Sequence, residues 1–356
     1  MIDKHSFDDA NIRRIIQAYG TTYELTQRAV FALGLVEALR KVGLPFIFKG
    51  GSSLMLLFQT PKRLSTDVDI LVDPQCEIEP YIEKVSHVFP FLSFKESHRK
   101  TTKKIAKRHF RLEYASPRDG KPLTILLDVL YGENHYQNIK SASIDNDLLL
   151  SDDAPPLTVQ IPSVESLLGD KLTAFAPHTI GVPFFGENYP SDKRLEVIKQ
   201  FYDVGCLYEL ARDFDEVKQT YLRVAKDELY YRGDQHTIID CLRDSFSSAL
   251  SILSLGRISH EDYLHYLAGF RRISEHVLGL KLNPNNAYPF ASRIMLLSAD
   301  IASNSNLFQI AIDHQQPFLE APFNKINRLQ NIDSDSFDRA AISIKMMGSA
   351  LERLEI

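Results

Sequence analysis

Residues 49–73 read KGGSSLMLLFQTPKRLSTDVDILVD and join a glycine-rich turn to an acidic segment. The apolar run PFIF before the turn predicts a short strand, because two glycines follow it. SSLMLLFQ predicts a short helix whose N-cap is Ser52 or Ser53. TDVDILVD alternates apolar and acidic residues, which is the period-two pattern of a strand. This stretch therefore predicts a strand, a turn, a short helix and a second strand in direct succession.

The acidic strand and the turn have the chemistry of a nucleotide site. Asp67 and Asp69 lie two apart on a strand, so both side chains point to one face. Asp73 shares that face, and three like charges repel each other unless water or a cation neutralises them. The glycines let a phosphate approach the backbone, and free N–H groups at the start of a helix favour an anion. We expect phosphates held beside Mg²⁺; the alternative is a structural helix cap next to a solvated strand face.

The remaining periodicities divide the chain into an α/β part and a helical part. Helical spacing of apolar residues predicts a helix over residues 8–42, and a further helix is expected over residues 78–88. RHFRLEYAS and KPLTILLDVLYG predict two strands joined by a PRDG turn, which indicates a hairpin. VESLLGDKLTAFA predicts a helix, and from residue 192 onward the pattern is almost wholly helical.

Composition sets the broad class of protein. With 356 residues, 44% of them hydrophobic and 24% charged, the chain suits a globular protein of two domains, or of one large domain with an appendage. The net charge of -5 gives no general attraction to nucleic acid. Cys76, Cys206 and Cys241 are isolated, which argues against a zinc site or a disulfide framework and suits a reducing cytoplasm. The N-terminus lacks the layout of a signal peptide, and no apolar run approaches the ~20 residues of a membrane span, so we expect a cytoplasmic protein without membrane contact.

The opening stretch also resembles a known family. A Gly-Ser pair followed by Asp-x-Asp is similar to the first motif of the DNA-polymerase-β-type nucleotidyltransferases. The longer form, FKGGSSL followed by RLSTDVDI, resembles the AbiEii/AbiGii toxin family, which includes the MenT-type tRNA-modifying toxins. The matching positions are Lys49, Gly50, Gly51, Ser52, Ser53, Leu54, Arg63, Ser65, Asp67 and Asp69.

Two downstream segments fit the same family. GDKLTAFAPHTIG resembles its K-L-x-A motif and makes Lys171 the motif's lysine. KQFYDVGCL resembles its K-D-x-x-D helix, in which Asp203 takes the second acidic position. Gln200 replaces the first acid, which leaves the role of that position open. The resemblance covers roughly residues 30–210.

The resemblance implies an α+β fold with two domains that have different roles. Residues 1–160 would form a polymerase β-like nucleotidyltransferase domain, with a mixed sheet and flanking helices. Residues 161–356 would form an all-α helical bundle that completes the active-site cleft. Asp67 and Asp69 would be the metal ligands, and Asp128 would be a third carboxylate on a neighbouring strand that helps activate the nucleophile. An edge-of-strand or capping aspartate is the alternative for Asp128.

Phosphate contacts are implied for both parts of the chain. In the first part, the residues expected to bind the nucleotide are Gly50, Gly51, Ser52, Arg63 and Ser65. Arg63 would pair with a phosphate or an aspartate, unless it is an exposed loop arginine.

Lys171 would bind phosphate and stabilise charge, unless it is a surface lysine with a buried stem. Asp203 would orient Lys171 through an ion pair or contact the nucleotide, and a purely structural salt bridge between helices is the alternative.

The expected activity is that of an Mg²⁺-dependent nucleotidyltransferase toxin from a toxin–antitoxin or abortive-infection system. It would use an NTP and an RNA acceptor, most plausibly the tRNA 3′ end, and could have a cognate antitoxin protein as partner. Residues 95–111 hold eight lysines and arginines against one glutamate, which suits an RNA backbone but also a solvated edge strand. A small-molecule acceptor such as an antibiotic, or a non-catalytic NTP-binding module, are the alternatives.

Overall fold

The computed structural model describes residues 1–97, 107–186, 191–233, 235–309 and 316–352. The chain divides into two compact units. The first comprises Met1–Ser163 together with Glu275–Lys281, and the second comprises Val164–Ser274 and Leu282–Ile356. The segment Glu275–Lys281 thus leaves the helical part of the sequence and packs with the first unit.

The first unit is built on a seven-stranded mixed sheet. Its strands in sequence are β1 (Ile47–Lys49), β2 (Val68–Val72), β3 (Phe91–Glu96), β4 (Lys107–Ala115), β5 (Pro122–Tyr131), β6 (Ile139–Ser143) and β7 (Thr158–Pro162). Their order across the sheet is β3-β4-β5-β2-β1-β7-β6. The β2–β5 and β1–β7 pairs are parallel and the other neighbours are antiparallel. This order places β2, the acidic strand, at the centre of the sheet.

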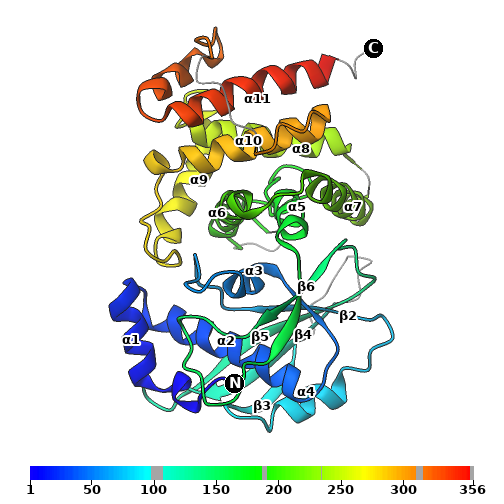
Figure 1. Ribbon diagram of the computed structural model, residues 1–356, viewed down its shortest axis with the longest axis vertical. Helices are drawn as coiled ribbons and strands as arrows, with labels where there is room; N and C mark the ends of the chain where they lie inside the picture. The colour runs from blue at the N-terminus through cyan, green and yellow to red at the C-terminus, as the bar shows by residue number, and fades with distance from the viewer. Residues whose placement is uncertain (98–106, 187–190, 234, 310–315, 353–356) are drawn as a thin grey trace. The chain divides into compact units, whose positions relative to one another are not determined.

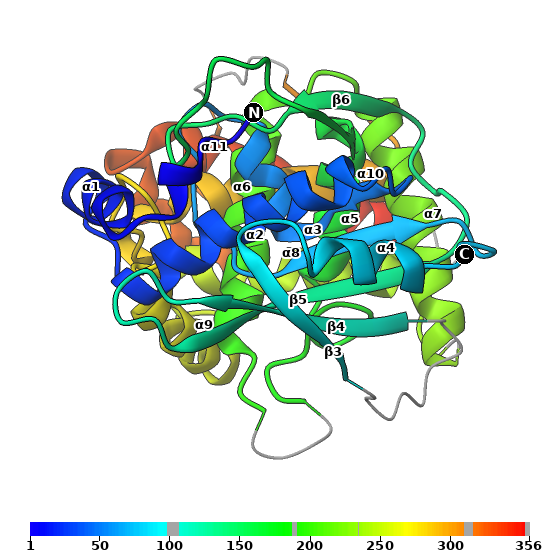
Figure 2. The same ribbon diagram turned by 90° about the horizontal axis from the view of Figure 1, so that it is seen from below.

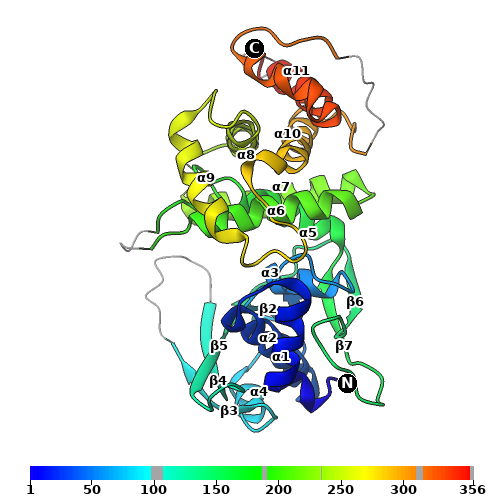
Figure 3. The same ribbon diagram turned by 90° about the vertical axis from the view of Figure 1, so that its left-hand side faces the viewer.

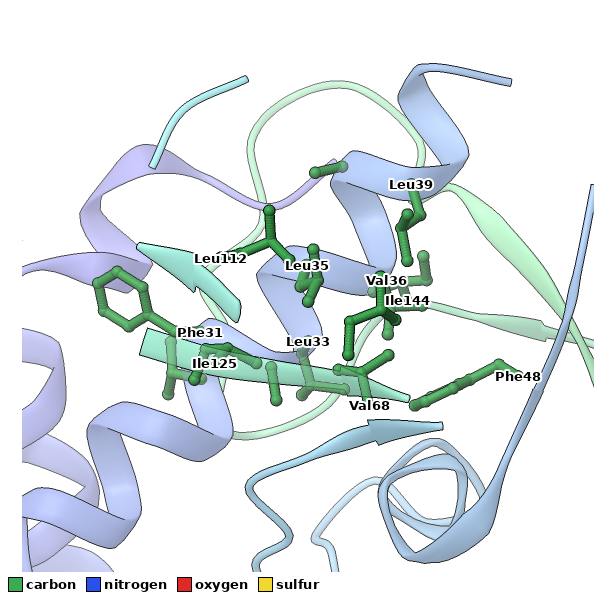
Figure 4. Packing of buried hydrophobic residues seen from close by; sticks show 14 of the residues in the cluster. Phe31, Leu33, Leu35, Val36, Leu39, Phe48, Val68, Leu112, Ile125 and Ile144 are labelled. Carbon is green, nitrogen blue, oxygen red and sulfur yellow. The ribbon is translucent and has the colours of Figure 1, made fainter. Parts of the chain in front are cut away.

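Helices cover one face of this sheet and form the core with it. The helices of the first unit are α1 (Asp9–Tyr19), α2 (Tyr23–Lys41), the short α3 (Gly50–Ser53) and α4 (Glu79–Val85), with 3₁₀ turns η1 (Lys4–Phe7) and η2 (Leu54–Leu56). Figures 2 and 3 show α2 lying along the strands, and α4 packs beside it. Leu33, Val36 and Leu39 of α2 meet Val68 and Ile125 in the buried cluster drawn in Figure 4. In β2, Val68, Ile70 and Val72 therefore face this cluster, and Asp69 lies on the opposite face.

Residues 8–42 are helical, as predicted, but they form two helices with a break between them. Helix α1 ends at Tyr19, and Gly20 follows in the left-handed region with a φ of 70°. The Gly20 N–H donates to the carbonyl of Ile16, which closes the last turn. The chain re-enters a helix after Thr22, whose backbone is extended. The helical periodicity on either side conceals this break.

The prediction for the short helix after the turn is wrong in its bounds. α3 begins at Gly50 and already ends at Ser53, and its N-cap is Lys49. The 3₁₀ turn η2 follows. The serines do not cap the helix, because the Ser52 hydroxyl donates to the carbonyl of Asp67 and the Ser53 hydroxyl donates to that of Gly50.

Other local predictions of the first unit are confirmed. The strands expected before the turn and in TDVDILVD are β1 and β2. The expected hairpin is the antiparallel pair β4–β5, joined through residues 116–121. The expected helix over 78–88 is the shorter α4. The middle of the basic stretch 95–111, residues 98–106, lies outside the described residues, so the prediction of an RNA-binding patch there stays a prediction.

The second unit is helical, as the periodicity predicts. Its elements are α5 (Val164–Ala174), α6 (Arg194–Leu210), α7 (Phe214–Arg232), α8 (Ile238–Leu253), α9 (His260–Ile273), α10 (Tyr288–Ser303) and α11 (Ser334–Glu352), with 3₁₀ turns η3 (Pro284–Asn286) and η4 (Phe323–Asn331). Figure 1 shows α5, α6 and α7 in one layer, α8 and α10 in the next, and α11 beyond them. α5 packs on both α6 and α7, and α10 packs on α6, α8 and α11. No helix in the described part of the chain is long and apolar enough to cross a membrane. The fold is therefore α+β, a mixed sheet with flanking helices followed by a helical bundle.

Candidate active site

The glycine turn lies directly against the acidic strand. Gly50 has a φ of 74°, a conformation that side chains rarely adopt, and a Cβ at this position would overlap the Asp69 carboxylate. The Ser52 hydroxyl donates to the backbone carbonyl of Asp67, although these residues are 15 apart in sequence. Ser52 itself is fully buried. The turn and the two aspartates therefore belong to one local structure.

Arg63 and Ser65 approach the same turn from the other side. A Cβ on Gly51 would lie 2.6 Å from Nη2 of Arg63 and 3.1 Å from the hydroxyl oxygen of Ser65. Arg63 is only 5% exposed, and its Nη1 donates to the carbonyl of Leu64 over 3.2 Å. The alternative of an exposed loop arginine is therefore wrong. Arg63 forms an isolated β-bridge with Val277, so the segment 275–281 supports this side of the turn.

A row of four polar residues crosses the open face of the sheet. Lys49 on β1 is the register partner of Asp69 on β2, which is the partner of Asp128 on β5, which is the partner of His109 on β4. Register partners on neighbouring strands point to the same face. The adjacent residues of these strands, such as Val68, are buried in the core on the opposite face. The sheet thus presents a cation, two carboxylates and an imidazole in one line.

Asp128 is anchored within that row. Nδ1 of His109 lies 2.7 Å from Oδ1 of Asp128, and the side chains are 9% and 30% exposed, respectively. Asp128 lies inside β5 and is paired on both sides, to β2 and to β4. The alternative of an edge-of-strand or capping aspartate is therefore wrong.

The carboxylates have the donor chemistry of a divalent cation site. Hard carboxylate oxygens are the ligands that Mg²⁺ prefers. Asp69 shares a face with Asp128, while Asp67 precedes β2 and its Oδ1 lies 3.7 Å from a guanidinium nitrogen of Arg28. Among the described residues, no three His, Cys, Asp or Glu side chains gather into a group that could hold a metal ion. The donors fit a cation, but Asp67 has to leave Arg28 to join it, and this half-exposed ion pair costs less than about 1 kcal/mol to open.

The second unit holds the other two expected site residues in one cluster. Nζ of Lys171 on α5 lies 2.9 Å from Oε1 of Gln200 and 3.2 Å from Oδ2 of Asp203, both on α6. The Lys171 side chain is 9% exposed and that of Asp203 is 2% exposed. The alternative of a surface lysine is therefore wrong, and the ion pair expected between Lys171 and Asp203 is present.

Gln200, which departs from the family pattern, is a hydrogen-bond partner of Lys171 in this cluster. Its amide oxygen accepts a hydrogen bond from Lys171, as a carboxylate would, but it carries no charge. Among the residues that the structure describes, Lys171 forms one ion pair, with Asp203.

Two residues of the first unit were missed by sequence reasoning. Arg28 lies in the middle of α2, where an arginine carries no signal of its own. His109 alternates with Phe110 in β4, so its face could have been predicted, but its partner could not, because that depends on the hairpin register. The structure thus assembles Gly50, Gly51, Ser52, Arg63, Ser65, Asp67, Asp69 and Asp128 in the first unit, and Lys171 and Asp203 in the second.

Comparison with known proteins identifies the family. A family model described as "Nucleotidyl transferase AbiEii toxin, Type IV TA system" matches residues 35–278, which is more than half of the chain. The chain belongs to the AbiEii nucleotidyltransferase toxin family. This confirms the family indicated by KGGSSL and STDVDI. AbiEii proteins are transferases of type IV toxin–antitoxin systems, which implies an NTP substrate and an antitoxin partner, and nucleotidyltransferases of this kind generally use a divalent metal.

Solved structures of other proteins are similar to this chain. MenT4, a nucleotidyltransferase toxin from Mycobacterium tuberculosis H37Rv, is similar with a TM-score of 0.50 and 12% identity, over 92% of this chain and 98% of that chain. JHP933 from Helicobacter pylori is similar with a TM-score of 0.45 and 14% identity, over 78% of this chain and 95% of that chain. A search of the curated proteins finds no match to this chain. At these identities the solved structures speak for the fold alone.

Proposed function

We propose that this AbiEii protein is an Mg²⁺-dependent toxin that transfers a nucleotidyl group from an NTP to RNA, at the 3′ end of tRNA. The observation that carries the proposal is the contact between the Gly50 turn and Asp69, which joins a phosphate-binding element to a carboxylate face. The tRNA acceptor draws support from the motif resemblance to a family that includes tRNA-modifying toxins, and from the charge of residues 95–111.

The reaction is an in-line attack of a ribose hydroxyl on the α-phosphate of the NTP, with pyrophosphate as leaving group. Asp67 and Asp69 would hold the Mg²⁺, which supplies charge neutralisation at the phosphate oxygens. Asp128 would accept the proton of the attacking hydroxyl, because it is a carboxylate one strand away from Asp69.

Other residues would hold the triphosphate. The backbone N–H groups at Gly51 and Ser52 would bind phosphate oxygens, since Gly50 allows the chain to turn at this point. Arg63 would add a charged, bidentate donor. Within the second unit, Lys171 would serve as a phosphate-binding cation, with Asp203 and Gln200 holding its ammonium group.

The proposal is tested by a labelling assay. The purified protein is incubated with total tRNA, Mg²⁺ and each α-³²P-labelled NTP in turn. We expect label on tRNA with one or two of the NTPs, its loss with EDTA, and its return when Mg²⁺ is restored. Asp69→Asn should reduce the rate by at least about 100-fold, because a charge-stabilising group is removed.

The matched control is Asp73→Asn, which removes a carboxylate just beyond the other end of the same strand. Asp73 accepts a hydrogen bond from the backbone of Gln75, and its loss should leave labelling near the wild-type rate. Absence of label with every NTP, or equal labelling by wild type and Asp69→Asn, contradicts the proposal. Label that appears on an added small molecule and not on RNA, with pyrophosphate released, indicates a small-molecule acceptor instead.

A growth assay tests the toxin role separately. Expression of the wild-type protein should arrest bacterial growth, and expression of Asp67→Ala at the same level should not. Arrest by both proteins would separate the toxicity from nucleotidyl transfer.

A further inference from the structure

We propose that His109 is a positioning residue that holds Asp128 in the orientation in which it accepts the proton of the attacking hydroxyl. The inference rests on the proposed nucleotidyl transfer and adds to it a residue outside the family motifs. The observation behind it is the short contact between Nδ1 of His109 and Oδ1 of Asp128, 2.7 Å, at the end of the polar row on the open sheet face.

The need for such a residue follows from the row itself. Asp69 and Asp128 are register partners on parallel strands, and neighbouring strands lie about 4.8 Å apart. Two ionised carboxylates at this spacing repel each other, so each tends to rotate away from its neighbour. Lys49 flanks the pair on the Asp69 side and His109 flanks it on the Asp128 side. Repulsion alone would leave the Asp128 carboxylate free to adopt a range of side-chain rotations. A hydrogen-bond donor on its outer side selects one of them.

The chemistry of the contact determines which atom donates the hydrogen bond and which atom accepts the proton of the substrate. An ionised carboxylate only accepts hydrogen bonds, so Nδ1 of His109 has to carry the proton that it donates to Oδ1. The second carboxylate oxygen of Asp128, Oδ2, is then the atom that takes the proton from the substrate hydroxyl. His109 is 9% exposed and lies inside β4, so its ring is held by the strand and cannot follow the substrate. His109 thus acts through Asp128 and is not itself a catalytic residue.

Three substitutions at His109 separate this role from simple packing. The amide nitrogen of His109→Asn stands near the position of Nδ1 and can still donate to Asp128, whereas that of His109→Gln stands near Nε2 and cannot. His109→Leu fills similar space without a donor. We expect His109→Leu and His109→Gln to lower kcat by about 100-fold with KM for the NTP changed by less than about twofold, and His109→Asn to stay within about tenfold of wild type.

A double variant tests whether His109 works through Asp128. Asp128→Asn combined with His109→Leu should be no slower than Asp128→Asn alone, because residues that act as one unit are not additive. Equal activity of the Asn and Gln variants, a wild-type kcat in His109→Leu, or additive losses in the double variant would overturn the proposal. If His109→Leu fails to fold in a thermal melt, the Asn and Gln variants, which both stay polar, decide the question.

A readout independent of activity separates this inference from the proposed function. Nitrogen-15 NMR of the histidine rings, with the His109 signal assigned from its absence in His109→Asn, reports which ring nitrogen carries the proton. We expect an Nδ1-bound proton in the wild type and a changed signal in Asp128→Asn. A ring protonated at Nε2 alone overturns the positioning role whatever the activity, whereas absence of transfer with every NTP, alongside an Nδ1-bound proton, overturns only the proposed reaction.

Discussion

Gly50 is the residue at which the turn and the acidic strand meet, and two separate properties of glycine are used there. The φ of 74° needs a residue without a steric penalty in the left-handed region, and the space beside the Cα is occupied by the Asp69 carboxylate. The left-handed backbone concerns stability, whereas the missing Cβ concerns the orientation of Asp69. A substitution at Gly50 changes both, so its effect on activity needs a control in which only the left-handed backbone is affected.

Gly20 supplies that control for the substitution Gly50→Ala. It lies in the same unit with a φ of 70°, and a Cβ there would have no neighbour within 4 Å. Gly20→Ala should lower the free energy of unfolding by about 1–2 kcal/mol, the cost of the left-handed backbone for a residue with a Cβ, and Gly50→Ala should lower it by at least as much, because its methyl group also overlaps Asp69. Only Gly50→Ala should abolish nucleotidyl transfer, because its methyl group displaces the Asp69 carboxylate. Chemical denaturation followed by circular dichroism and the labelling assay measure the two effects, and equal activity in the two variants would show that Asp69 is not displaced.

At the scale of elements, local pattern is enough for the turn and for β1, β2, β4 and β5, whereas β3, β6 and β7 were not predicted. Alternation in TDVDILVD and the glycines after PFIF fix β2 and β1, because both signals depend only on neighbours in sequence. The break between α1 and α2 was missed, since helical spacing continues on both sides of it. Gly20 followed by Thr22 was the available signal, a C-terminal glycine and then a residue that commonly caps a helix.

The contacts of the site could be predicted only where they follow from the chain or from the family. Asp67 and Asp69 are two apart in sequence, so their common face is a local prediction, although β2 itself begins at Val68. The contact of His109 with Asp128 depends on strand register, and the burial of Lys171 depends on how α5 packs against α6. Neither feature can be predicted from a short stretch of sequence. For Lys171 the family motif carried the prediction, and the structure adds Gln200 as the second acceptor.

Helix α8 begins with a capping box whose contribution can be isolated. The backbone N–H of Asp240 donates to the Thr237 hydroxyl, and the backbone N–H of Thr237 donates to the Asp240 carboxylate over 2.9 Å. Thr237→Ala should lower the free energy of unfolding of the helical unit by about 1 kcal/mol. The control is Ser259→Ala at the N-cap of α9, where the side chain makes no capping hydrogen bond. Because the chain has no tryptophan, circular dichroism is the suitable probe, and a loss as large in Ser259→Ala as in Thr237→Ala would refute the assignment.

At the scale of the whole molecule, the two units differ in how their carboxyl groups respond to acid. In the first unit, hydrogen bonds lower the pKa of several carboxyls below their ordinary values, with partners such as Arg13 for Asp9 and Thr60 for Asp147. The carboxyls of this kind in the first unit are Asp9, Glu79, Asp119, Asp147 and Asp152. In the second unit, hydrogen bonds from Arg194 and Thr237 lower the pKa of Asp192 and Asp240 in the same way. Burial raises the pKa of Asp244 and Asp300 in the second unit.

These pKa shifts predict that acid unfolds the first unit at a higher pH than the second. A carboxyl with a lowered pKa stabilises the fold above its unfolded pKa, 3.8 for aspartate, and loses that contribution as the pH falls through the lower folded value. A carboxyl with a raised pKa does the opposite, since the fold favours its protonated form, so Asp244 and Asp300 offset the loss in the second unit. Hydrogen–deuterium exchange between pH 5 and pH 3, corrected for the intrinsic rate, should show protection falling first in the strands of the first unit. Asp147→Asn should weaken that pH dependence, because it removes one of the shifted groups, and earlier loss of protection in α8 and α10 would contradict the account. Because the carboxyls with a lowered pKa are largely exposed, added salt should screen their interactions. The difference between the two units in acid-dependent loss of protection should therefore become smaller.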